Sequence, residues 1–153
     1  MTVVEFFDYN CPFCRRVKPA IENLLEQDRD VRLVYREWPI LGEGSVFAAR
    51  AALASIKQGK YEEFHWAMMG MQGQAEEATV LQIAETIGLD IEQLLQDMKD
   101  TSIDEHIATS SQLTQILGFR GTPSFVIGDV LVPGIITSEA LIQHVTEARA
   151  SKK

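Results

Sequence analysis

Hydrophobic and polar positions follow two different periods in the first third of the chain. Residues 2–8 are almost continuously apolar, with Glu5 as the one acid among them until Asp8, which is typical of a buried strand. Apolar residues then recur at helical spacing from Pro12 to about Asp28, and a second apolar run at 31–35 indicates another strand. The opening segment is therefore predicted to be strand, crossover helix, strand, with the two strands parallel.

The segment from Gly42 to Gly118 has helical spacing almost throughout. An Ala-rich helix is expected to be capped by Ser45 and to end near Gly59, and a later one is expected to be capped by Thr79. Further helices are predicted from about Tyr61, from Asp90, and up to Gly118. No repeat, linker or low-complexity stretch interrupts the chain, so a single domain over residues 1–153 is predicted.

The last part of the chain returns to strand patterning. Two short apolar runs, 124–127 and 130–132, flank the hairpin signal Gly128-Asp129. A final helix is expected to be capped by Thr137 or Ser138. The predicted order is β-α-β, a helical block, then β-β-α. An α/β fold with a sheet of about four strands and helices on its faces packs these elements most simply.

Composition narrows the class of protein. The chain has 153 residues, 46% of them hydrophobic, and a formal net charge of -8. A chain of this length can bury a hydrophobic core without stabilising disulfide bonds. The excess of acidic over basic residues argues against nucleic acid as a partner. No apolar stretch has the length of a membrane span, and Met1 does not open a secretory signal. A cytoplasmic chain or a mature domain without its leader is therefore expected.

The two cysteines of the chain form the motif Cys11-Pro12-Phe13-Cys14 at the predicted start of the first helix. Positions three apart on a helix share a face, so the sulfurs can bond to each other. Such a bond closes a very small loop and adds little stability, which favours a redox role over a structural one. Cys11 is the expected nucleophile, because the helix N-terminus stabilises its thiolate, and Cys14 is the expected resolving thiol.

The alternative for two cysteines at this spacing is half of a zinc site. Zinc needs four ligands, whereas His65, His106 and His144 are far apart in the sequence and no second cysteine pair is present. No metal site is therefore expected.

Glu5 is an acid within an apolar strand, where it is costly unless it is partnered or protonated. It could lie on a solvated strand face or be buried. The neighbouring residues make both faces of the strand apolar, which favours burial.

Several segments together resemble a known family. Glu5-Phe6-Phe7-Asp8-Tyr9-Asn10-Cys11-Pro12-Phe13-Cys14, with Gly121-Thr122-Pro123 opening a later strand, resembles the bacterial DsbA-like thioredoxin-fold thiol:disulfide oxidoreductases. The stretches 38–42 and 59–65 are similar to the same family, so the resemblance covers nearly the whole chain. It implies a thioredoxin-like core at 1–40 and 118–150 with a helical insertion at 42–117. A leading strand, which proteins of this family often carry before the strand that precedes the cysteine motif, is missing, which suggests a trimmed chain or a variant that starts late.

The resemblance also implies roles for single residues. Pro123 would be cis and lie beside the dithiol, which leaves the backbone of Thr122 free to pair with an extended substrate; a plain turn proline is the alternative. Glu5 would exchange a proton with Cys14. Phe13 stands where the strongest oxidants of the family have histidine, so Cys11 is expected to be less acidic. The redox potential should then lie between about -270 mV (thioredoxin) and about -120 mV (DsbA).

The predicted function is dithiol–disulfide exchange with cysteine-containing protein substrates, preferably as an oxidant. The family implies a membrane partner that reoxidises the dithiol, a periplasmic location after removal of a leader, and no cofactor. A monomer is preferred, since no dimerisation arm precedes the domain. Three alternatives are a disulfide isomerase or reductase, a glutathione-dependent transferase or isomerase of the same fold, and a soft-metal carrier.

Overall fold

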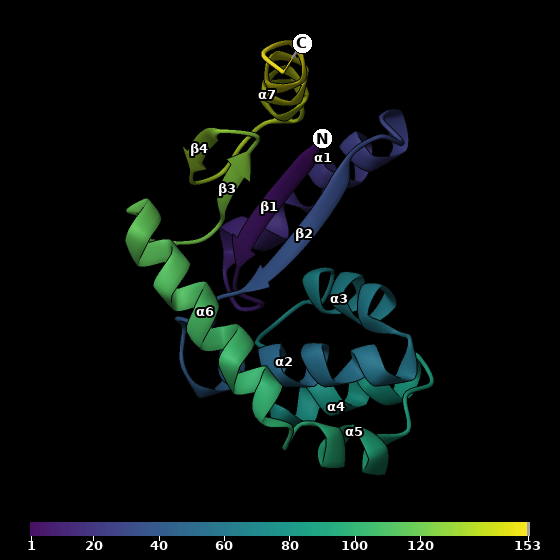
Figure 1. Ribbon diagram of the computed structural model, residues 1–153. Helices are drawn as coiled ribbons and strands as arrows, with labels where there is room; N and C mark the ends of the chain where they lie inside the picture. Colours follow the sequence, from purple (N-terminus) through teal and green to yellow (C-terminus); the bar gives the residue numbers. More distant parts are fainter. Residues whose placement is uncertain (153) are drawn as a thin grey trace.

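The fold is built on a four-stranded sheet with the strand order β2-β1-β3-β4, seen in a computed structural model that describes residues 1–152 (Figure 1). β1 pairs with β2 in parallel and with β3 antiparallel, and β3 pairs with β4 antiparallel. The mixed α/β architecture predicted from the patterning is thereby confirmed. The strands are β1 (Thr2–Phe7), β2 (Arg32–Glu37), β3 (Ser124–Ile127) and β4 (Val130–Pro133).

Helices α1 (Pro12–Gln27) and α7 (Ser138–Ala150) pack against each other and against one face of the sheet. Their apolar residues form one core with the inward-facing residues of β1 and β3, including Val3, Phe125 and Ile127. Side chains alternate along a strand, so Glu5 lies on the same face of β1 as Val3, beneath α1. On the other face, Phe6 packs against Phe119, which follows the last helix of the block, with ring centroids 5.7 Å apart.

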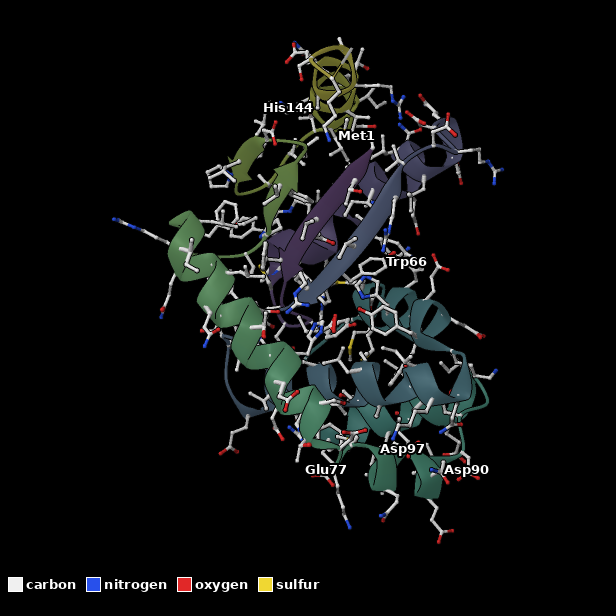
Figure 2. All side chains as sticks on the ribbon, viewed as in Figure 1. Met1, Trp66, Glu77, Asp90, Asp97 and His144 are labelled. Carbon is white, nitrogen blue, oxygen red and sulfur yellow. The ribbon has the colours of Figure 1, made fainter. Side chains whose placement is uncertain are left out.

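The remaining helices form a block beyond one end of the sheet, and α6 runs from that block back to β2 (Figure 1). Trp66 on α3 contacts both cores and lies between the block and the sheet (Figure 2). None of the helices within residues 1–152 has the length and apolar character needed to cross a lipid bilayer. The elements of the block are α2 (Glu43–Ala54), the 3-10 helix η1 (Ser55–Gln58), α3 (Tyr61–Met69), α4 (Glu77–Thr86), α5 (Ile91–Asp97) and α6 (Thr101–Leu117).

Two predicted helix caps were wrong. Helix α2 begins after Gly42, and Ser45 instead lies buried inside it with its hydroxyl on Asp8. Helix α4 begins after Glu76, and Thr79 is the third residue of a capping box whose hydroxyl accepts the Glu76 N–H. In both cases the residue with the hydroxyl group lies three positions after the true N-cap. A Ser or Thr at that position resembles an N-cap in the sequence.

Candidate active site

Both cysteines lie at the start of α1. Cys11 is the N-cap residue with extended backbone angles (φ -79°, ψ 117°), and Pro12 occupies the first turn, where its missing N–H costs nothing. The two thiols are free, so the structure represents the reduced dithiol. Cys11 retains 4% exposure against 1% for Cys14, and it is therefore the sulfur that solvent or a substrate can reach more easily.

The two thiols have opposite acid–base character. The hydrogen bond from Cys14 lowers the pKa of Cys11 from 9.0 to about 6, and the backbone N–H groups of Phe13 and Cys14 contribute in the same direction against the effect of burial. Burial, followed by the same hydrogen bond, raises the pKa of Cys14 well above its ordinary value. At neutral pH the negative charge therefore resides on Cys11, and Cys14 holds the proton.

Glu5 is buried under this pair at 1% exposure, as the apolar strand predicted. Its neighbours across the sheet are Tyr35 on β2 and Phe125 on β3. Burial, with a smaller effect from the charge of Cys11, raises the pKa of Glu5 from 4.5 to about 8. The Oε2 atom of Glu5 has no hydrogen-bond partner among the described residues. A carboxyl group that is neutral at pH 7 thus lies close enough to feel the charge of the dithiol.

The loop before β3 brings Thr122 to Cys11 across 111 residues of sequence. In its protonated form the Cys11 thiol donates to the Thr122 carbonyl at 3.3 Å, and the peptide bond between Thr122 and Pro123 is cis. Ser124 then begins β3, which pairs with β1 directly before the cysteine motif. The strand pairing is what places the 121–123 loop beside the start of α1.

A groove of about 430 Å³ opens next to this loop. Phe13, which is 48% exposed, and Ile135, also 48% exposed, contribute apolar surface to it, and Arg120 is its one charged lining residue. The lining residues are Phe13, Arg120, Gly121, Thr122, Ser124, Pro133, Gly134 and Ile135.

Asp8 and Asn10, to which the sequence reasoning gave no role, hold the turn before Cys11. The buried Asp8 carboxylate accepts hydrogen bonds from the Ile40 and Leu41 N–H groups at 2.8 and 3.0 Å, and from Ser45 at 2.7 Å. The Asn10 amide pairs with both backbone groups of Ala75. The start of α1 is thereby tied to the helical block. The sequence did indicate this role, because Asp8 and Asn10 are two polar residues between an apolar strand and the cysteines.

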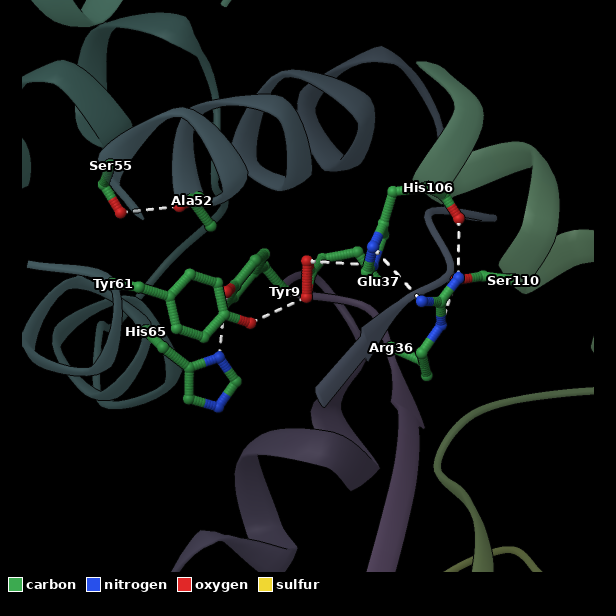
Figure 3. A network of polar contacts seen from close by, with 9 residues as sticks. All are labelled: Tyr9, Arg36, Glu37, Ala52, Ser55, Tyr61, His65, His106 and Ser110. Carbon is green, nitrogen blue, oxygen red and sulfur yellow. Dashed lines mark hydrogen bonds and ion pairs between the residues drawn. The ribbon is translucent and has the colours of Figure 1, made fainter. Parts of the chain in front are cut away.

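A second polar cluster joins β2, α3 and α6 (Figure 3). Tyr61 donates to the buried Glu37 carboxyl at 2.7 Å, and His106 Nε2 lies 3.5 Å from its other oxygen. Arg36 can only donate, so His106 Nδ1 accepts from it at 3.2 Å and Nε2 carries the hydrogen that faces Glu37. Burial raises the pKa of Glu37 to about 8.

The cluster continues toward the cysteine loop through Tyr9, whose hydroxyl lies 2.8 Å from His65 Nδ1 (Figure 3). His65 is enclosed by aromatic rings, and burial lowers its pKa to about 3. The sequence reasoning missed this cluster because it ended the second strand at Tyr35, before Arg36 and Glu37. It also treated each histidine in isolation.

This fold with a free dithiol at a helix start defines the class of thioredoxin-fold thiol–disulfide oxidoreductases. The chain belongs to the DSBA-like thioredoxin domain family, which matches residues 2–146. It is therefore an oxidoreductase whose fold supports dithiol–disulfide exchange in general.

Solved structures agree with this assignment. A thioredoxin-like oxidoreductase from Silicibacter pomeroyi DSS-3 is 60% identical, with a TM-score of 0.96 over 97% of this chain and 86% of that one. The thiol-disulfide exchange protein alpha-DsbA2 from Wolbachia pipientis is 33% identical, with a TM-score of 0.88 over 95% and 80% of the two chains. The catalytic domain of Proteus mirabilis ScsC is 28% identical, with a TM-score of 0.87 over 97% and 83%.

Curated relatives include much longer proteins. The Na(+)/H(+) antiporter NhaA 3 of Salinispora tropica is 31% identical over 155 residues, which cover 100% of this chain and 24% of that protein. The chain thus spans about a quarter of the length of the curated relatives it matches. The antiporter names describe those whole proteins.

Proposed function

We propose that the chain oxidises thiols of protein substrates through Cys11 and Cys14. The observation that carries this proposal is the place of Cys11 at the N-cap of α1, where the Cys14 thiol and backbone N–H groups stabilise its thiolate and lower its pKa to about 6. An acidic Cys11 stabilises the reduced form, and a stabilised reduced form makes the disulfide a stronger oxidant. Reference thiols of this fold have pKa values of about 7 in thioredoxin and about 3.5 in DsbA.

The reaction begins with the Cys11–Cys14 disulfide. A substrate thiolate bonds to the Cys11 sulfur, the Cys11–Cys14 bond breaks, and Cys14 leaves with the electron pair and takes up a proton. A second substrate thiolate then attacks the substrate sulfur of the mixed disulfide. Cys11 leaves as a thiolate, the substrate holds a disulfide, and the dithiol has gained two electrons.

Glu5 is proposed as the proton partner of Cys14. The raised pKa of Cys14 means that it cannot leave readily without a proton, and Glu5 is a protonated carboxyl at neutral pH. Glu5 lies on the face of β1 beneath the helix that carries Cys14. The Glu5 carboxylate left by that transfer can take a proton back from Cys14 when Cys14 is next oxidised.

The Thr122 and Pro123 backbone is proposed as the docking edge for an extended substrate. Its place within hydrogen-bonding distance of Cys11 supports this role, since a peptide paired there would have its cysteine beside Cys11. Pro12 holds the helix start, and Phe13 forms part of the groove wall. A periplasmic setting, a membrane partner that reoxidises the dithiol, and a monomeric state complete the proposal.

The test is the equilibrium of the Cys11–Cys14 pair with glutathione, combined with the Cys11 pKa read from thiolate absorbance. A potential clearly above about -270 mV with a Cys11 pKa near 6 is expected. A thioredoxin-like potential would contradict the oxidant role. Cys14→Ser should accumulate mixed disulfides with substrate proteins, whereas the matched Cys11→Ser should form none.

A further inference from the structure

The groove beside the cysteines is mostly apolar and has one positively charged lining residue, which affects the substrates it can accept. Its walls near the dithiol are apolar, contributed by Phe13, Pro133 and Ile135. Its one charged lining residue is Arg120, at the beginning of the loop that carries Thr122. This cation lies on the surface of a chain whose formal net charge is -8.

The charge of Arg120 is not neutralised by the protein. The side chain is exposed, and the ion pairs formed within residues 1–152 use other cations. The Arg16 guanidinium does not line the groove, but it rests 5.1 Å from the centre of the Phe13 ring and adds positive charge beside that lining residue. An anionic side chain in the groove would therefore meet the Arg120 guanidinium and no lining carboxylate.

We propose that the groove selects cysteine-containing substrate segments that carry an apolar residue and an acidic residue flanking the cysteine, and that Arg120 determines the charge preference. This inference rests on the proposed function, since it concerns the substrate of the same dithiol. The apolar residue packs on Phe13 and Ile135, while the acidic one reaches the Arg120 guanidinium. Arginine suits this purpose, because two N–H groups of its planar guanidinium can donate to the two oxygens of one carboxylate.

The preference is tested with short peptides that contain one cysteine, an apolar neighbour and, two positions away on either side, Glu, Gln or Lys. The oxidised protein is mixed with each peptide. The rate at which the peptide thiolate opens the Cys11–Cys14 bond is followed by acid quench and mass spectrometry. Glu peptides should react about two- to fivefold faster than Gln peptides, the size expected for an exposed ion pair, and Lys peptides more slowly. Added salt should reduce the differences between the rates of the three peptides.

Arg120→Glu should reverse the order, so that Lys peptides become the fastest. The matched control is Arg29→Glu, which changes the net charge equally. Arg29 lies beyond the far end of the 16-residue helix α1, about 24 Å along the helix from Cys11. The control should keep the wild-type order.

Three outcomes overturn the inference: equal rates for the three peptides, an unchanged order in Arg120→Glu, or a reversal in Arg29→Glu as well. A failure of every peptide to open the disulfide is a different result. It would overturn the proposed function and, with it, the preference, whereas equal but measurable rates leave the proposed function intact.

Discussion

Phe13 lies between the two cysteines, half exposed, and its side chain offers no hydrogen-bond donor to Cys11. Replacing it with a protonatable residue should stabilise the thiolate further. For Phe13→His we expect the Cys11 pKa to fall by about one unit and the redox potential to rise by about 30 mV. Thiolate absorbance and the glutathione equilibrium measure the two quantities.

Phe13→Leu is the matched variant, since it changes the shape of the groove wall without adding a donor. It should leave the Cys11 pKa near 6. A potential in Phe13→His that is equal to or below that of the native chain would contradict the expectation.

Glu5 lies within the electrostatic reach of Cys11 and is the proposed proton partner of Cys14. In Glu5→Gln the carboxyl can no longer ionise, so the rate of dithiol oxidation by glutathione disulfide should lose its inflection near pH 8. Above pH 8, where Glu5 is a carboxylate that can accept the Cys14 proton, the rate should also fall by about a hundredfold, because that acceptor is removed. An inflection that survives the substitution would assign it to another group, and the role of Glu5 would be withdrawn.

The junction of β2, α3 and α6 is held by the cluster around Glu37, in which Tyr61 donates to a carboxyl that is neutral at pH 7. Glu37→Gln keeps an acceptor for Tyr61 but cannot acquire a charge. The pKa of Glu37 is raised on folding, so its contribution to stability is present at low pH and lost as the pH rises through about 8. The variant should therefore lose less stability than the native chain between pH 5.5 and pH 8.5.

Thermal unfolding at these two pH values measures the difference. Glu77→Gln on α4 removes an exposed carboxylate and serves as the control, with the native pH dependence expected. If Glu37→Gln and Glu77→Gln lose stability equally between the two pH values, the neutral state of Glu37 is not what the junction requires.

Across the whole molecule, two buried acids and two histidines, one buried and one partly buried, change the stability with pH in opposite directions. Glu5 and Glu37 have raised pKa values, so their contributions decline as the pH rises from 4.5 to about 8. His65 and His106 have pKa values lowered to about 3 and about 4, chiefly by burial. Their contributions decline as the pH falls below 6.5, because only the unfolded chain then takes up protons.

The oxidised protein, in which no thiol titrates, should therefore have a broad maximum of Tm between about pH 4.5 and 6.5 and lose stability on both sides. Calorimetry across pH 3.5 to 9 provides the measurement. A Tm that rises steadily from pH 6.5 to 8.5 would be incompatible with two neutral buried carboxyl groups.

Local patterns were sufficient for the order of the elements and for the dithiol. Neighbouring residues alone determine three such features. They are the apolar run around Glu5, the proline in the first turn of α1 and the glycine that ends α6. Backbone geometry and burial of adjacent side chains are enough to predict such features. The placement of Cys11 at a helix N-terminus, with its acidity, belongs to the same group.

Contacts between distant segments could not be predicted in this way. Tyr61, Glu37 and His106 come from three elements, and only the packing of α6 and α3 on β2 brings them together. The same holds for Arg120, whose position in the groove follows from the pairing of β3 with β1. Desolvation and hydrogen bonding depend on all neighbours in space. The neutral state of Glu37 and the charge of Arg120, unpaired within residues 1–152, are therefore properties of the tertiary structure.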